Sequence, residues 1–146
     1  MTTGPFTLLY PMFAMVLLSF VVLIRLFRSR VGAVRAGEID KSYFRLYRGA
    51  TEPEATAKIS RHFVNLFEAP TLFYVVCVAA MVTQKGGTLM QTLAWCYVLA
   101  RIVHAFIHLG PNRLRWRVRA YFVSWLVLLA MWVVLVIAVT PTGGRY

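Results

Sequence analysis

Four long apolar stretches constrain the fold of this chain more than any other feature. They run approximately over residues 6–24, 63–82, 88–109 and 120–139. A helix needs about 20 predominantly apolar residues to cross the hydrocarbon core of a bilayer, which is about 30 Å thick. Each stretch meets that requirement. The sequence therefore predicts an all-α integral membrane protein, a bundle of four membrane-spanning helices in a single domain over residues 1–146.

The composition agrees with a membrane protein and excludes several other classes. Of the 146 residues, 60% are hydrophobic and 14% are charged, whereas about a quarter of a typical soluble domain is charged. Two cysteines are too few for a disulfide scaffold. The net charge of +11 would suit nucleic acid, but DNA-binding domains do not carry this much uninterrupted apolar sequence. We expect the lipid bilayer as a partner and no nucleic acid.

The distribution of basic residues predicts the orientation of the helices. The connection over residues 25–62 contains nine Lys and Arg, and the one over residues 113–119 contains four arginines. The connection between them contains only Lys85, and the two tails contain only Arg145. Cytoplasmic loops carry an excess of Lys and Arg. Both basic connections are thus predicted to be cytoplasmic and both termini outside, with a bacterial inner membrane as the expected location.

Local signals predict the limits of the second helix. The segment Thr51–Glu54 is typical of a capping box with proline in the first turn, which predicts a helix that begins near Glu52, outside the membrane. Pro70 lies inside this helix and has no N–H to pair with the carbonyl of Leu66, which predicts a kink. The short polar turn Gln84–Gly87 predicts that the second and third helices are antiparallel neighbours.

Polar side chains at membrane depth carry most of the functional information, because each is costly unless it is paired or hydrated. On the second helix, the spacings i, i+4 and i+7 place Arg61, Asn65 and Glu68 on one face. Arg101, on the third helix, is the natural partner for a carboxylate across the hairpin. We therefore predict a structural ion pair between Glu68 and Arg101.

The third helix carries two histidines, His104 and His108, on the same stripe as Arg101. Two histidines one turn apart provide at most half of a metal site, and His62 is the only other histidine in the chain. A bis-histidine haem needs a histidine on a facing helix, and a membrane di-iron enzyme needs far more ligands. The sequence analysis therefore predicts neither metal nor haem.

A third polar group, Arg113, Arg117 and Tyr121, lies at the start of the fourth helix at spacings of i, i+4 and i+8. Arginines at a cytoplasmic helix end serve first as orientation signals and lipid-headgroup contacts. One face of this helix can nevertheless point into the bundle. Together, the three groups predict a mainly cationic cavity that opens to the cytoplasm, suited to a small molecule with carboxylates and to an apolar second molecule that arrives through lipid.

The order and spacing of these residues resemble the MAPEG family, the membrane-associated proteins in eicosanoid and glutathione metabolism, and in particular its bacterial members of the microsomal glutathione transferase type. The motifs that carry the resemblance are Arg61-x-x-x-Asn65-x-x-Glu68, Arg101-x-x-His104 and, after the GPNR turn, Arg117-x-x-x-Tyr121. The resemblance covers nearly the whole chain. It implies a homotrimer that binds glutathione between neighbouring subunits at the cytoplasmic side.

The resemblance also implies roles for individual residues. The residues expected to hold glutathione are Arg25, Arg28, Arg61, Asn65, Glu68 and Arg113. The residues expected at the reacting sulfur are Arg117, Tyr121 and His108. A guanidinium such as that of Arg117 stabilises a thiolate, which is the nucleophilic form of a thiol. The implied activity is attack of this thiolate on a lipid-soluble electrophile or hydroperoxide.

Two positions depart from the specialised members of the family. His108 stands where prostaglandin- and leukotriene-forming members have a tyrosine, and Val118 stands where the prostaglandin-forming type has a serine. These departures argue against eicosanoid synthesis and favour a generic glutathione transferase or peroxidase, or a member without catalytic activity. His108 would then supply a proton or form a hydrogen bond within the bundle. The alternatives are a non-catalytic trimeric scaffold or lipid-binding subunit, and a proton-coupled exporter with Glu68 as its membrane carboxylate.

Overall fold

The computed structural model describes residues 6–140, which form a bundle of helices. The helices are α1 (Leu9–Arg35), α2 (Tyr43–Leu46), α3 (Glu54–Asn65), α4 (Ala69–Val82), α5 (Thr88–Leu109) and α6 (Leu114–Val139). Four segments are long and apolar enough to cross a membrane, with α3 and α4 together forming the second of them. We call this pair the second span. The all-α fold with four spans is thus confirmed.

The helices extend beyond the apolar stretches at the basic end of the bundle. The third span coincides with the predicted range 88–109. In contrast, α1 continues to Arg35, about three turns past the predicted end at residue 24. The fourth span begins at Leu114 instead of residue 120. Charged residues do not interrupt backbone hydrogen bonding, so the apolar stretches define the part of each helix suited to the membrane and not the whole helix.

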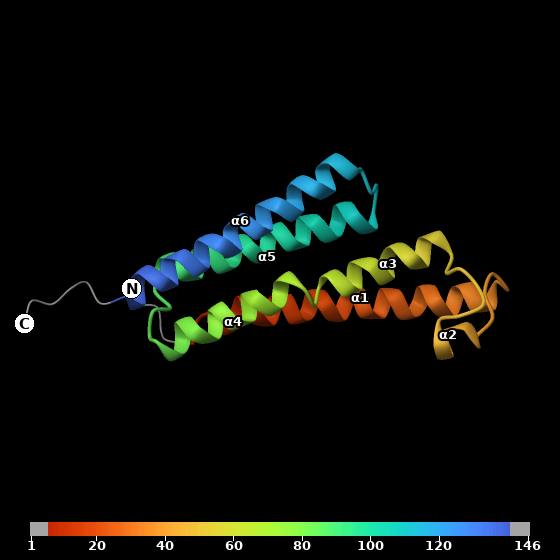
Figure 1. Ribbon diagram of the computed structural model, residues 1–146, viewed down its shortest axis with the longest axis horizontal. Helices are drawn as coiled ribbons and strands as arrows, with labels where there is room; N and C mark the ends of the chain where they lie inside the picture. The colour runs from red at the N-terminus through yellow and green to blue at the C-terminus, as the bar shows by residue number, and fades with distance from the viewer. Residues whose placement is uncertain (1–5, 141–146) are drawn as a thin grey trace, which may run out of the picture.

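The four spans run alternately in opposite directions (Figure 1). The two basic connections lie at one end of the bundle, and the α4–α5 turn lies at the other, beside the start of α1 and the end of α6 (Figure 1). The most extensive contacts are those of α5 with α6 and of α1 with α3, and α5 also contacts α3 and α4. The second and third spans are therefore antiparallel neighbours, as the short turn between them predicted.

The second span is interrupted between α3 and α4, a larger departure from a straight helix than the predicted kink. Glu68 has a non-helical backbone with φ −87° and ψ −91°, and Pro70 lies in the first turn of α4. A proline is tolerated there because the first amides of a helix have no intrahelical acceptor. The Thr71 hydroxyl donates to the carbonyl of Phe67 at 2.6 Å, which satisfies one acceptor at the break.

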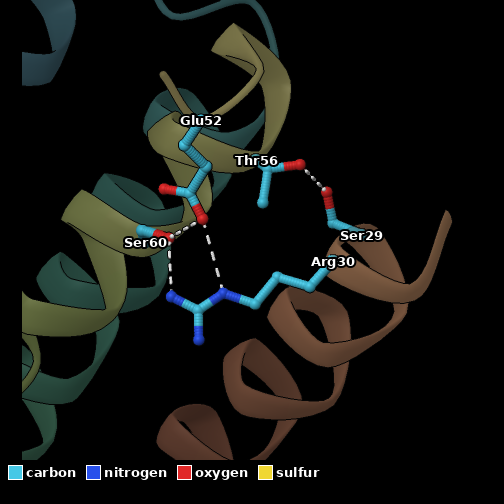
Figure 2. A network of polar contacts seen from close by, with 5 residues as sticks. All are labelled: Ser29, Arg30, Glu52, Thr56 and Ser60. Carbon is cyan, nitrogen blue, oxygen red and sulfur yellow. Dashed lines mark hydrogen bonds and ion pairs between the residues drawn. The ribbon is translucent and has the colours of Figure 1, made fainter. Parts of the chain in front are cut away.

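A polar network ties the long basic connection to α1 (Figure 2). Arg30 donates from Nε to Glu52 Oε1 at 3.4 Å and from Nη2 to Ser60 Oγ at 3.3 Å. Ser60 Oγ also donates to Glu52 Oε1 at 3.1 Å. The hydroxyls of Ser29 and Thr56 are 2.7 Å apart, which adds a second link between α1 and α3. These contacts hold the start of α3 against the part of α1 that extends beyond the apolar stretch.

The predicted capping box at Thr51–Glu54 is wrong. Pro53 is the N-cap residue, with ψ 142° and no side-chain capping hydrogen bond, so α3 begins at Glu54. In a capping box, Thr51 would be the N-cap residue and the Glu54 carboxylate would accept from its amide. The extended backbone of Pro53 leaves Thr51 and Glu52 outside the helix, and the Glu52 carboxylate contacts Arg30 and Ser60.

The same arginine holds the short helix α2. Its guanidinium lies 5.2 Å from the ring centroid of Phe44 and 5.6 Å from that of Tyr47, within the range of cation–π attraction. Just before α2, the Ser42 amide donates to Asp40 Oδ1 at 2.7 Å. Hydrogen bonds from Ser42 hold the pKa of Asp40 below its usual value. The connection is thus folded against the bundle.

We expect Arg30→Ala to expose this connection to proteolysis. The hydrogen bonds of Arg30 contribute about 1 kcal/mol, so their loss raises the fraction of molecules with a detached connection about fivefold. The rate of cleavage follows that fraction when detachment is fast compared with cleavage. Chymotrypsin should therefore cleave within residues 40–50 of the detergent-solubilised protein about fivefold faster. Arg35→Ala, an exposed arginine on the same helix, is the control. Equal cleavage of the two variants would contradict the role of Arg30.

Candidate functional site

Two cavities at the basic end of the bundle contain most of the predicted site residues. The smaller has a volume of about 260 Å³ and is lined by Arg61, Asn65, His104, His108, Arg117, Val118, Tyr121 and Phe122. The larger, of about 620 Å³, shares Arg61, His108 and Arg117 with it and extends under the long connection. The shared residues make the two cavities adjoining. Their walls come from α3, α5 and α6, and from the basic connections that join the spans.

The structure brings five of the nine predicted residues together at the smaller cavity. These five are Arg61, Asn65, His108, Arg117 and Tyr121. The other four lie elsewhere. Arg25 Nη2 donates to the carbonyl of Leu109 at 3.4 Å, and Arg28, Glu68 and Arg113 are exposed and line neither cavity.

Arg101 is fully buried and connects α5 to the break in the second span. Its Nη2 donates to the Asn65 carbonyl at 3.1 Å and to Asn65 Oδ1 at 2.6 Å. Asn65 Nδ2 in turn donates to Glu68 Oε2 at 3.0 Å. Asn65 therefore mediates between a buried cation and an exposed carboxylate.

The predicted direct ion pair between Glu68 and Arg101 is wrong. Within residues 6–140, the one ion pair joins Arg30 and Glu52. The interruption of the helix explains the difference: it turns Glu68 to the surface and makes the Asn65 carbonyl available to the guanidinium. A helix that continued through this region would keep that carbonyl in its own ladder of hydrogen bonds.

Arg117 is held in place by a residue that the sequence analysis did not select. Its Nη1 donates to Asn112 Oδ1 at 2.8 Å. Asn112 has a left-handed backbone with φ 48°, a conformation that asparagine tolerates well, and its amide donates to the Ile107 carbonyl at 2.8 Å. Gly110 precedes it, where a Cβ would lie 2.8 Å from the Phe106 carbonyl oxygen. The turn after α5 thus requires these residue types and positions Arg117.

The three histidines of the chain lie together between α3 and α5. The ring centroids of His62 and His108 are 5.0 Å apart, those of His62 and His104 are 5.4 Å apart, and those of His104 and His108 are 5.6 Å apart. The Tyr121 ring contacts His104 edge-on at 5.6 Å. The sequence alone did not predict that His62 would join the pair on α5. The third histidine could have been found from the antiparallel pairing, since His62 is three residues from Asn65 and His104 three from Arg101.

Comparison with known proteins assigns the chain to one family. The sequence model of the MAPEG family matches residues 8–137, which include every residue that lines the two cavities. The chain belongs to the MAPEG family. Neither a curated protein nor a solved structure matches the chain. MAPEG proteins are membrane proteins that include glutathione transferases and peroxidases, and they generally use glutathione. Together with the four apolar spans, membership makes this chain an integral membrane protein.

We expect Arg101→Leu to destabilise this MAPEG protein. The substitution leaves two oxygens of Asn65 without their donor, and each buried acceptor that loses its partner costs about 1–3 kcal/mol. The thermal unfolding midpoint in detergent should fall clearly below that of the wild type. Arg119→Leu, an exposed residue that stacks on Trp116, should leave it nearly unchanged.

A double-mutant cycle separates the contact itself from general damage. Because Arg101 and Asn65 act through one contact, the effects of Arg101→Leu and Asn65→Ala should be less than additive in the double variant. Additive losses of stability would contradict the direct coupling of these two residues.

Proposed function

We propose that this protein is a glutathione-dependent membrane transferase or peroxidase that activates the glutathione thiol at the basic end of the bundle. The observation that carries the proposal is the position of Arg117, which lines both cavities beside Arg61, His108 and Tyr121. A guanidinium held by Asn112 at the edge of a cavity is a fixed positive charge. Family membership supports glutathione as the molecule that this charge serves.

The chemistry begins with ionisation of the bound thiol. A free cysteine thiol has a pKa of about 8.5 and is mostly protonated at neutral pH. A neighbouring guanidinium favours the thiolate and lowers that pKa, which raises the fraction of nucleophile. Arg117 is the residue proposed for this role. Tyr121 and His108 line the same cavity and are the groups placed to exchange protons with the substrates.

Two reactions follow from a thiolate at this position. In transfer, the sulfur forms a bond to an electrophilic carbon while the leaving group departs with its electron pair. In reduction of a hydroperoxide, the thiolate takes the terminal oxygen and the alkoxide leaves as the alcohol after protonation. A second glutathione then converts the sulfenic acid to glutathione disulfide and water. Both reactions need the same activated sulfur, so Arg117 serves either one.

The polar side chains of the second span are suited to the rest of glutathione. Glutathione carries two carboxylates, and the exposed guanidinium of Arg61 lies at the rim of both cavities. Asn65 offers an amide for the peptide groups, and Glu68 is an acceptor for the amine. Val118 and Phe122, which line the smaller cavity, are apolar and exposed in the single chain. A lipid-soluble second substrate would enter between them.

A homotrimer would explain why some residues predicted to hold glutathione do not line a cavity in a single chain. Arg28, Glu68 and Arg113 are exposed in one chain. In an assembly with the site between subunits, such residues can reach glutathione from a neighbour. We further propose that the basic end faces the cytoplasm of a bacterial inner membrane, with both termini outside, following the distribution of Lys and Arg.

The thiolate of bound glutathione provides the direct test. Addition of glutathione to the purified protein at pH 7 should give a thiolate difference spectrum in the ultraviolet. The signal should disappear as the pH falls below the lowered pKa of the bound thiol. Arg117→Ala should abolish the signal, whereas Arg119→Ala, an exposed arginine of the same helix, should retain it.

The same experiment distinguishes the alternatives. Absence of both binding and thiolate at millimolar glutathione would exclude the enzyme and favour a scaffold or lipid-binding subunit. Binding with an unchanged thiolate signal in Arg117→Ala would reject this arginine as the activating group. Proton-coupled uptake into vesicles that is lost in Glu68→Gln would favour the exporter.

The oligomeric state is the second test of the proposal. The protein mass in a detergent complex, measured by light scattering with correction for bound detergent, should equal three chains of 16.6 kDa each. A monomer would rule out a site shared between subunits.

A further inference from the structure

The histidine cluster between α3 and α5 has the features of a metal site. One ring nitrogen from each of His62, His104 and His108 lies within 4.8 Å of the others. His62 is fully buried and His104 is 3% exposed, while His108 is half-buried and lines both cavities. Two of these residues lie one turn apart on α5, and the third lies on the facing helix α3.

The ring nitrogens lack the partners that buried imidazoles normally have. Among the described residues, both ring nitrogens of His62 and of His104 are without a hydrogen-bond partner, and so is Nδ1 of His108. Buried polar groups are almost always hydrogen-bonded or bound to an ion or water. Packing alone does not require histidine here, because an apolar ring would fill the same space without unpaired nitrogens. The cluster therefore points to a ligand that accepts several lone pairs at once.

We propose that His62, His104 and His108 bind a Zn²⁺ ion, with a fourth coordination position open to the smaller cavity. Neutral imidazole is a good ligand for zinc, and three protein ligands with one exchangeable ligand is the arrangement of catalytic zinc sites. Tetrahedral bonds of about 2.0–2.1 Å place ligand nitrogens about 3.4 Å apart. Small rotations of the rings bring the nitrogens from their present spacing to this one.

The charges around the cluster determine the fourth ligand. Arg101 lies one turn from His104 on α5, and Lys58 and Arg117 line the larger cavity together with His108. These three side chains place positive charge near the histidine rings. In the part of the chain that the structure describes, no carboxylate is hydrogen-bonded or ion-paired to the three rings. Bare Zn²⁺ would be repelled by these cations. An anion such as hydroxide in the fourth position reduces the charge of the centre and can accept a hydrogen bond from the cationic side of the cavity.

This inference goes beyond the proposed use of glutathione and reverses the expectation that the chain holds no metal. That expectation depended on two histidines of one helix, and α3 provides the missing third ligand. Within residues 6–140, no cysteine or carboxylate joins the three histidines in this group. With zinc bound, His108 is a ligand and Tyr121 is the side chain of the smaller cavity that remains to exchange protons. Zinc binding is measured without glutathione, so its failure would leave the glutathione proposal intact.

The test uses the full chain, purified in detergent without a polyhistidine tag and treated with a chelator. Titration with Co²⁺ should give the intense visible bands of a tetrahedral centre, and Zn²⁺ should displace the Co²⁺ at one ion per chain. His62→Gln and His104→Gln should each weaken binding at least about 100-fold. Cys96→Ala, which removes an exposed thiol outside the cluster, should bind like the wild type.

Two results would overturn the proposal. One is a wild-type protein that gives no tetrahedral Co²⁺ spectrum and retains less than stoichiometric Zn²⁺ after gel filtration. The other is zinc binding that is unchanged in a folded His62→Gln variant. X-ray absorption at the zinc edge of the wild-type protein removes any dependence on variant folding, because it should report three imidazole nitrogens and one oxygen. A different ligand set would reject the site.

Discussion

The buried guanidinium of Arg101 determines how the polar part of the structure is arranged. A charged side chain in the middle of a membrane helix costs about 2.5–3.5 kcal/mol by insertion scales, so it must find strong acceptors. Arg101 has no exposed surface and finds two oxygens of Asn65 on the facing span. The backbone carbonyl of Asn65 is available to Arg101 because the second span is interrupted there. The buried charge and the broken helix therefore explain each other.

The same contact sets the register between α3 and α5. Because the two helices are antiparallel, positions toward the basic end have decreasing numbers on α3 and increasing numbers on α5. Pairing of Asn65 with Arg101 thus places His62, three residues away, beside His104. His108 lies one turn beyond His104 on α5, where it contacts His62 and lines both cavities. A shift of either helix by one turn would separate the histidines, so the cluster depends on the guanidinium contact below it.

The sequence was sufficient to predict the spans, their antiparallel order and the gathering of Arg61, Asn65, Arg117 and Tyr121, because these depend on apolar length, charge and helical spacing. The sequence was not sufficient to predict contacts that depend on the local backbone conformation. The choice of Asn65 over Glu68 as partner of Arg101 follows from the break before Pro70, which a periodicity argument treats as a kink. The capping box failed for a related reason: the extended backbone of Pro53 makes this residue the N-cap and leaves Thr51 outside the helix.

The electrostatics of the basic end connect the two ligands proposed for it. Arg61 and Arg117 create a positive potential that favours the carboxylates and thiolate of glutathione. The same potential opposes a metal cation at the neighbouring histidines, unless the metal brings an anion with it. Glutathione and a zinc ion with its bound anion therefore have one property in common: each brings negative charge into the cavity beside Arg117. Arg101 adds to this potential at the histidines, and its Nη2 also donates to Asn65, which ties α5 to the second span. Arg101 therefore has a structural role in addition to its charge, whereas Arg61 and Arg117 line the cavities and act on the ligands.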